Sequence, residues 1–566
     1  MAAAAPWALA LIIVAVCGLA AGSWRVYSAT WDEPEHLAAG VELLDRGKYE
    51  YDTEHPPLAR VPLALGPWLA GARAFGTPPP DGRLEGVDIL YSGGHYWRYL
   101  TLARLGTLPF LALLLYATWL WGRRLFAAPA TALLAVLLLA SVPPVLGHGA
   151  LASLDVAAAA TILLALYALQ HWLVTARRRD ALVFGLAAGV AVATKFSAIP
   201  FLGLSVLTLA LVRIGLGGRA GRAAPSPAAG AGGAVHAPWR VWPAGLAIAA
   251  LAALLPLWLV YAPRSPDPAG VAFRFNWAVS YLLLSHGPPH ALGVLLAHLW
   301  LPRELKDLVN GVVAVKAHND TGHLSYLLGE VRRDGWWYFY LVALAVKTPI
   351  PLLLGAPFGL AWLARQGWRR ADAWPLAPLV LVITVLGFAS VFSRINIGVR
   401  HILIVYPFLA LATAATVRRA WQGIAALRHR GVARAATVAL AAAVTWQLST
   451  LVSAFPDYLP YFNEAVAHPE RVLVDSDLDW GQDLRRLELR AARLRIPHLA
   501  LAYRGTADLK REPLPPFTVL PGRRPTHGWV AVSQLARTRN LNDYAWLDAY
   551  RPVERVGKSI DLYYIP

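Results

Sequence analysis

Long apolar blocks alternate with short polar segments along most of this chain. Each block approaches the roughly 20 residues that an α-helix needs to cross a hydrocarbon core of about 30 Å. Transmembrane helices satisfy their backbone hydrogen bonds internally, so the pattern predicts an all-α, polytopic membrane protein. We expect about eleven spans, near residues 7–22, 99–121, 129–147, 150–172, 181–196, 199–216, 241–261, 337–363, 374–393, 399–418 and 435–454.

Arginines concentrate in alternate short loops between these blocks, as in the run Arg177-Arg178-Arg179. The positive-inside rule places such loops and the N-terminus in the cytoplasm, in a plasma membrane of the bacterial inner-membrane kind. We divide the 181–216 block into two spans because this keeps both flanking arginine clusters on one side. Three regions then lie on the extracytoplasmic face, namely 23–98, 262–336 and 455–566.

The last of these regions has a different pattern from the rest of the chain. Short apolar runs at 471–474 and 498–503 flank a charged helical pattern at 482–495. This alternation is typical of a small α/β domain. We therefore expect a transmembrane module over 1–454 and an extracytoplasmic α/β domain over 455–566.

Composition narrows the class of protein further. Hydrophobic residues make up 57% of the 566 residues and charged residues 15%, which excludes a soluble enzyme. The net charge of +18 follows from the loop arginines, so we interpret it as topogenic and expect no nucleic-acid partner. The single cysteine, Cys17, allows neither an intramolecular disulfide nor a thiolate metal cluster.

The first outer loop carries two groups that suit chemistry. Asp32 and Glu33 follow the first span directly, and carboxylates at the membrane surface could take a proton from an acceptor hydroxyl. In His55-Pro-Pro-Leu-Ala-Arg60, the prolines fix a turn and the Arg60 guanidinium could pair with a phosphate. The alternatives are a solvated acidic loop and a rigid entry into a short apolar helix.

Several ionisable residues lie in or beside apolar blocks, where an unpaired charge is expensive and usually functional. They are Asp155, Lys195, Lys347, Arg400 and His401. For the cations the alternative is snorkelling to the interface. For Asp155 the alternative is a carboxylate stabilised by a helix N-terminus.

Asp32-Glu33 followed by His55-Pro-Pro-Leu58 resembles the protein O-mannosyltransferase and aminoarabinose-transferase families, which have the glycosyltransferase-C fold. Other short motifs of these families follow in the expected order. They are Leu151–Asp155, Ala193–Phe196, Tyr326–Glu330, Trp336–Tyr340, Lys347–Pro349, Asn396–His401, Tyr406-Pro407 and Asp475–Asp483.

The resemblance implies an enzyme that transfers a hexose or pentose from a polyprenyl-phosphate carrier to a hydroxyl of a protein, lipid or glycan, with inversion. It implies Asp32 as the catalytic base and Glu33 as an aid in positioning donor or acceptor. Binding of the donor phosphate or substrate is expected of His55, Arg60, Asp155, Lys195, Lys347, Arg400 and His401.

The chain also departs from both families. Its loop 262–336 is too short for the β-domain that eukaryotic mannosyltransferases insert there. The aminoarabinose transferases carry Lys where this chain has His55. We therefore do not transfer the acceptor of either family, a protein hydroxyl or lipid A, to this chain.

No metal site is predicted, although some relatives use a divalent ion and that cofactor stays open. Asp475-x-Asp477-x-Asp479 begins like an EF-hand loop, but Trp480 and Arg486 stand where that loop needs Gly and Glu. His318 and His323 are five residues apart in a predicted loop, which is not a zinc-site spacing. The sequence has no Walker loop and no dinucleotide fingerprint, which fits a donor activated by lipid phosphate.

Two other functions compete with the transferase. A flippase for polyprenyl-linked sugars would also carry intramembrane charges, but the chain shows no internal repeat and its polar motifs cluster at one membrane face. A non-catalytic membrane scaffold would tolerate loss of Asp32 and Lys195.

Overall fold

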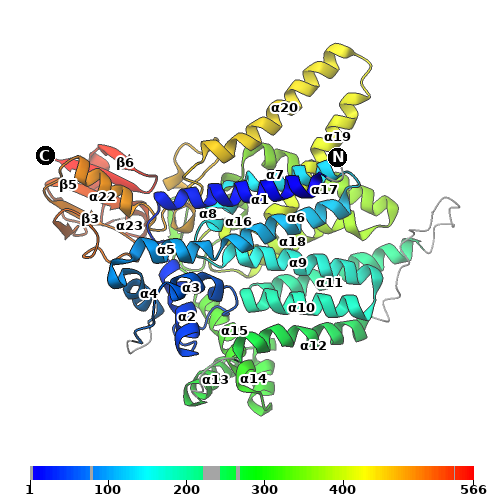
Figure 1. Ribbon diagram of the computed structural model, residues 1–566, viewed down its shortest axis with the longest axis horizontal. Helices are drawn as coiled ribbons and strands as arrows, with labels where there is room; N and C mark the ends of the chain where they lie inside the picture. The colour runs from blue at the N-terminus through cyan, green and yellow to red at the C-terminus, as the bar shows by residue number, and fades with distance from the viewer. Residues whose placement is uncertain (1–3, 77–80, 221–241, 263–267, 541) are drawn as a thin grey trace.

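The computed structural model describes residues 4–76, 81–220, 242–262, 268–540 and 542–566. Long helices run side by side through most of the molecule, and a small sheet lies at one end of them (Figure 1). The helices of this bundle are α1 (Ala5–Gly22), α5 (Tyr96–Leu105), α6 (Leu108–Leu125), α7 (Pro129–Ala140), α8 (Pro143–Gly149), α9 (Asp155–Thr175), α10 (Arg178–Thr194), α11 (Ala198–Ala220), α12 (Trp242–Tyr261), α16 (Phe339–Lys347), α17 (Ile350–Arg370), α18 (Ala373–Phe392), α19 (Val405–Ala425) and α20 (Arg430–Ser453).

The expected class, a multi-pass helical membrane protein, is confirmed, but the count of about eleven spans is not. Within the described residues, seven helices are long and apolar enough to cross a membrane, or up to nine if each bent pair is one span. Each of the eleven apolar blocks does contain helix. α10 has 17 residues, fewer than the roughly 20 that a straight span requires.

Prolines explain why two expected spans are broken. The 337–363 block divides into α16 and α17, which meet at 118°, and the 129–147 block divides into α7 and α8, which meet at 69°. Pro349 precedes α17, and Pro143 with Pro144 begins α8. A proline removes a backbone donor and disfavours helical geometry in the residue before it. Hydropathy alone does not contain this information.

Shorter elements cover one end of the bundle. The first loop forms α2 (Glu33–Arg46), α3 (Arg60–Leu69) and α4 (Gly82–Tyr91). The second loop forms α13 (Pro268–Leu283), α14 (Pro288–His298), α15 (Arg303–Thr321) and the antiparallel hairpin of β1 (Ser325–Leu327) and β2 (Glu330–Arg332). A 3-10 turn, η4 (Val399–Ile402), precedes α19.

The tail has the α/β character that its sequence pattern predicts. Its helices are α21 (Asp475–Leu478), α22 (Leu484–Arg493) and α23 (Gln534–Arg539). Its strands are β3 (Leu499–Ala502), β4 (Phe517–Val519), β5 (Gly528–Ser533), β6 (Glu554–Val556) and β7 (Ile560–Ile565). They form one mixed sheet in the order β4-β3-β5-β7-β6, in which β3 is parallel to both neighbours and β7 antiparallel to both of its own.

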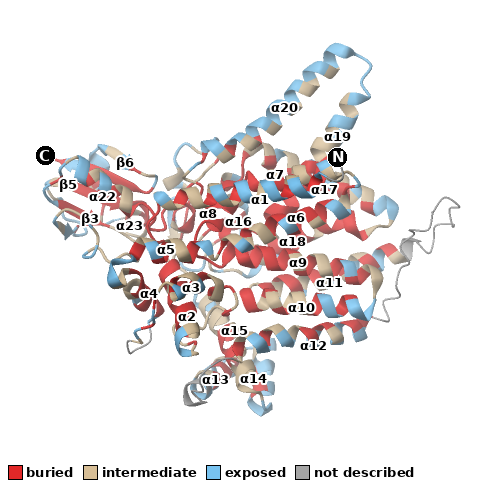
Figure 2. Ribbon diagram, viewed as in Figure 1, coloured by how far each residue is buried: buried red, intermediate tan, exposed pale blue. Residues whose placement is uncertain are grey.

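Small residues let the central helices approach closely. A Cβ added at Gly359 on α17 would meet the carbonyl oxygen of Ala412 on α19 at 1.8 Å. A Cβ added at Gly185 on α10 would likewise meet the carbonyl oxygen of Ala249 on α12, at 2.2 Å. Close backbone contact of this kind is a main source of helix association in lipid. Figure 2 shows the resulting buried interior, whereas α20 is mostly exposed.

We expect Gly359→Val to destabilise the protein by about 1–3 kcal/mol or more, because α17 and α19 must separate to admit the side chain. Gly387→Ala on α18 is the control, since a Cβ there meets nothing within 4 Å. The measurement is unfolding in mixed micelles. Equal stability of the two variants would contradict the close packing of α17 on α19.

Candidate active site

A cavity of about 1070 Å³ opens at the end of the bundle that carries the sheet and the loop helices. We call it the central cavity. Its walls come from segments far apart in the sequence, namely the first loop, the α10–α11 junction, α15, the end of α18, η4 and the tail. Its polar lining includes Asp32, Glu35, His36, Asp52, His55, Lys195, Lys316, His318, His323, Tyr340, Arg394, Arg400, His401, Asp475, Trp480 and Arg539.

Charges of alternating sign run along one wall of this cavity. Arg400 Nη1 donates to Asp32 Oδ2 at 2.6 Å and lies 3.5 Å from Asp155 Oδ2. Lys195 Nζ donates to the other oxygen of Asp155 at 2.5 Å. Asp155 is buried and is not part of the cavity lining. It holds Lys195 and Arg400 in place, and both of these cations line the cavity. The structure therefore brings four predicted site residues into one chain of ion pairs.

Local geometry leaves the Asp32 carboxylate free for this contact. Asp32 is the residue before α2, yet its side chain makes no capping hydrogen bond. Pro34 occupies the first turn of α2, where its missing N–H leaves one fewer donor to cap. The side chain is 21% exposed, and its open side faces the cavity.

Glu33, the neighbouring carboxylate, lies outside the lining and is 1% exposed. Arg104 binds it in a bidentate pair with both N–O distances at 2.8 Å. The backbone N–H groups of Thr30 and Ala152 donate to it as well, each at 2.8 Å. Glu33 thus ties the Asp32 segment to α5 and to the turn before α9. This arrangement suits a positioning residue.

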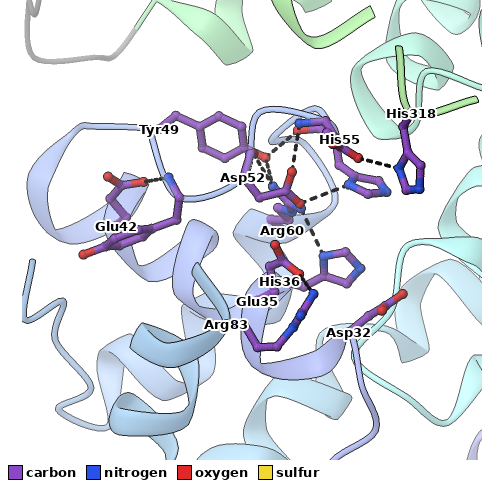
Figure 3. A network of polar contacts seen from close by, with 12 residues as sticks. Asp32, Glu35, His36, Glu42, Tyr49, Asp52, His55, Arg60, Arg83 and His318 are labelled. Atoms are coloured by element: carbon purple, nitrogen blue, oxygen red, sulfur yellow. Dashed lines mark hydrogen bonds and ion pairs between the residues drawn. The ribbon is translucent and has the colours of Figure 1, made fainter. Parts of the chain in front are cut away.

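Arg60, expected at a phosphate, is fully buried and points into the first loop instead. It forms an ion pair with Asp52, and its Nη1 donates to the Tyr49 hydroxyl at 2.5 Å and to the Asp52 carbonyl oxygen at 2.8 Å. Figure 3 shows this pair at the centre of a polar network. Arg60 therefore stabilises the first loop, and both terminal nitrogens of its guanidinium are already bonded within the protein, so they are not available to a phosphate.

Lys347 is also buried away from the lining. Its ammonium donates to the carbonyl oxygens of Leu459 at 2.9 Å and Asp477 at 2.5 Å, and it lies 4.4 Å from the centre of the Phe462 ring. It therefore fastens the tail to the break between α16 and α17. Sequence reasoning identified the cost of a charge in an apolar block but not these carbonyl partners, which lie more than a hundred residues away.

The tail contributes directly to the site, a role that the sequence left open. Asp477 Oδ1 accepts from the Val399 N–H at 3.1 Å, and Ser476 Oγ donates to the Ile397 carbonyl at 2.5 Å. These contacts hold the segment that presents Arg400. The guanidinium of Arg400 lies over the Trp480 ring, 4.4 Å from its centre. The Asp475–Asp483 motif was the available signal for this contribution.

Burial at this junction also changes acidity. Burial raises the pKa of Asp479 to about 7, although Asp479 Oδ2 accepts from the Leu535 N–H at 2.6 Å. That hydrogen bond places the start of α23 against the cavity, where Leu535 and Arg539 form part of the wall.

A second polar chain runs along the lining of the cavity from the first loop to the tail. His318 Nδ1 lies 3.1 Å from Glu54 Oε2, and His318 Nε2 lies 3.3 Å from His323 Nδ1. Arg539 Nη2 approaches His323 Nε2 at 3.3 Å and donates to Asp475 at 2.8 Å. Among the described residues, no group of three or more His, Cys, Asp or Glu side chains is arranged to hold a metal ion. Through these contacts, His318 and His323 connect the first loop, the second loop and the tail.

Among the other predicted residues, His55 and His401 both line the cavity. His55 Nδ1 lies 3.0 Å from Asp52 Oδ2. His401 follows Arg400 in η4, and its ring lies 6.4 Å from that of Tyr340. His36, one turn into α2, joins them in the lining and was not singled out from the sequence.

No protein-family model matches the sequence, and no curated protein matches it. One solved membrane transferase does share its architecture. The S. cerevisiae protein O-mannosyltransferase Pmt1-Pmt2 complex bound to the sugar donor aligns at 12% identity over 80% of this chain and 90% of that chain, with a TM-score of 0.50. This chain therefore has the fold of the glycosyltransferase-C membrane proteins, as its motifs predict.

Two further structures align less closely in space. ArnT from Cupriavidus metallidurans bound to undecaprenyl phosphate aligns at 13% identity over 98% of this chain and 97% of that chain, with a TM-score of 0.46. The archaeal oligosaccharyltransferase AglB from Archaeoglobus fulgidus, in complex with an inhibitory peptide and a dolichol-phosphate, aligns at 13% identity over 79% of this chain and 55% of that chain, with a TM-score of 0.41.

The two adjacent carboxylates should respond differently to neutralisation. We expect Glu33→Gln to lower the free energy of unfolding by about 3–5 kcal/mol, because it leaves Arg104 as an uncompensated buried charge. Asp32→Asn should change it far less, since Arg400 keeps Asp155. Unfolding of both variants in mixed micelles tests this, and a Glu33→Gln variant as stable as the wild type would contradict the structural role.

Proposed function

We propose that this chain is a membrane glycosyltransferase that moves a sugar from a polyprenyl-phosphate carrier to a hydroxyl acceptor. The observation that carries the proposal is the chain of ion pairs in which buried Asp155 joins Lys195 and Arg400, and Arg400 joins Asp32, on one wall of the central cavity. A carboxylate base beside two cations supplies both requirements of the reaction. The fold shared with a protein O-mannosyltransferase bound to its sugar donor supports the same class.

In this proposal Asp32 accepts the proton of the acceptor hydroxyl as its oxygen attacks the anomeric carbon. The bond from that carbon to the phosphate oxygen breaks, and polyprenyl phosphate leaves with the electron pair. Attack opposite the leaving group inverts the anomeric centre. General base catalysis of this kind contributes about 10²–10⁴-fold.

The leaving phosphate needs positive charge more than a proton. Lys195 uses one of its three N–H donors on Asp155, and Arg400 uses Nη1 on its two carboxylates. Arg400 lines the cavity, and its Nη2 makes no hydrogen bond with the described residues. Both cations therefore retain donors for a phosphate beside Asp32. Preorganised donors of this kind need no reorganisation as charge develops.

We further propose that the cavity opens on the extracytoplasmic face, with 1–454 as the membrane module and 455–566 as the outer domain. The arginine distribution supports this orientation. Asp475, Trp480 and Arg539 in the cavity wall support a part for the tail in substrate binding. The acceptor is a hydroxyl of a protein, lipid or glycan.

Asp32→Asn should lower the rate of sugar transfer by about 10²–10⁴-fold, because the amide keeps the size of the side chain but cannot take the proton. The assay follows release of free polyprenyl phosphate by purified protein in lipid, with a panel of polyprenyl-phosphate sugars and membrane extract as the source of acceptor. Asp334→Asn in an exposed loop is the control. Wild-type rates in Asp32→Asn would rule out the assigned base.

Lys195→Gln should weaken equilibrium binding of polyprenyl phosphate by about 10- to 100-fold, the equivalent of one hydrogen bond to a charged group. Asp155 stays paired with Arg400 in this variant, so the fold is expected to persist. Lys510→Gln, at an exposed position, is the matched control. If Lys195→Gln bound the lipid phosphate as tightly as the control, the phosphate site would lie elsewhere.

A further inference from the structure

Two histidines face the central cavity beside Asp32, and their hydrogen bonds fix where each carries its proton. His36 comes from α2 and His55 from the turn before α3. Their ring centres are 5.4 Å apart, and the rings are nearly perpendicular at 76°. In Figure 3 both rings lie on the same side of the Asp52–Arg60 pair as Asp32.

Arg60 determines the tautomer of His36. Its Nη2 lies 3.1 Å from His36 Nδ1. A guanidinium only donates hydrogen bonds, so Nδ1 must present its lone pair. A neutral His36 then carries its proton on Nε2, and that N–H is a hydrogen-bond donor.

Asp52 imposes the opposite tautomer on His55. Asp52 Oδ2 lies 3.0 Å from His55 Nδ1 and is also paired with Arg60, which favours the ionised carboxylate. A carboxylate only accepts, so His55 Nδ1 carries the proton. A neutral His55 therefore presents a lone pair at Nε2, and that atom is a hydrogen-bond acceptor.

The pKa values of both histidines are lowered, and this shift favours the neutral rings. Burial lowers the pKa of His36 well below its usual value, and the positive charge of Arg60 lowers it further. Burial, followed by the charge of Lys195, lowers the pKa of His55. Each histidine thus keeps one donor and one acceptor, with the Nδ1 atom of each already used.

Neither Nε2 atom has a hydrogen-bond partner among the described residues, although both histidines line the cavity. The pair therefore offers one donor and one acceptor to a ligand. A hydroxyl matches this arrangement, because it donates one hydrogen bond and accepts others. A phosphate oxygen matches it poorly, since it only accepts and would meet the lone pair of His55. This argues against the phosphate-binding role that the sequence suggested for His55.

We propose that His36 and His55 together bind one hydroxyl group of a sugar or other substrate, with His36 donating to its oxygen and His55 accepting its proton. The inference rests on the proposed function and adds a determinant of substrate choice. The hydroxyl belongs either to the transferred sugar or to the acceptor. A substrate without it would leave the donor of buried His36 and the acceptor of partly exposed His55 without this partner.

The test uses purified full-length protein in lipid and two series of compounds. One series contains polyprenyl-phosphate sugars that each lack one hydroxyl, and the other contains acceptors that each lack one hydroxyl. We expect wild type to reject one deoxy compound by about 10- to 100-fold in kcat/KM, the effect of a lost hydrogen-bonding pair. The series that contains this compound identifies the source of the hydroxyl.

Two amide variants at each histidine separate the two ring nitrogens. Asn places its amide near the position of Nδ1, so His36→Asn and His55→Asn can keep the contacts with Arg60 and Asp52 but lose the cavity-facing atom. Gln reaches the position of Nε2. We expect the Asn variants to bring the discrimination ratio towards 1 and the Gln variants to retain part of it. His429→Asn, at an exposed position on another part of the chain, should discriminate as wild type does.

Equilibrium binding of the same compounds is measured beside turnover. Absence of transfer from every donor would refute the proposed function, while the binding ratios would still test the histidine pair. Wild-type tolerance of every deoxy compound would overturn the inference, as would Asn variants that discriminate as strongly as wild type. Loss of discrimination in the folded Asn variants, with activity retained on the deoxy compound, is the supporting result.

Discussion

The cavity depends on one buried carboxylate, Asp155, at the start of α9. Alone, an ion in this position would be strongly destabilising, since the effective penalty for burying a charge is several kcal/mol. Lys195 and Arg400 compensate it from two other parts of the chain. Their pairing with Asp155 holds both cations at the cavity wall, and each cation keeps N–H groups that are not used in this pairing. The same contacts join α9, the α10–α11 junction and η4.

The tail completes this arrangement. Asp477 and Ser476 bind the segment before α19, and the Trp480 ring stacks against the guanidinium of Arg400. Lys347, at the end of α16, donates a hydrogen bond to the tail at the Asp477 carbonyl oxygen. The tail is thus part of the cavity wall. The wall of the cavity carries the paired charges of Asp32 and Arg400, with His36 and His55 beside Asp32.

Several residues chosen for chemistry act as supports in the structure. Glu33 is paired with Arg104, Arg60 with Asp52, and Lys347 with backbone carbonyls. Their sequence contexts are as suggestive as those of Asp32, Lys195 and Arg400. A charge in an apolar segment predicts a need for a partner, but that partner can be a ligand or another part of the protein. Only the position of the partner separates the two cases.

The sequence by itself determined the membrane class, the helical blocks, the α/β tail and most of the charges at the cavity. These properties depend on hydropathy and residue type within short windows, which the chain displays directly. The tertiary structure decided which carboxylate faces the cavity and which partners Glu33, Lys347 and Arg400 meet. These partners, which are Arg104 for Glu33, Leu459 and Asp477 for Lys347, and Asp32 for Arg400, lie tens to hundreds of residues away, and no local pattern specifies which of them will meet.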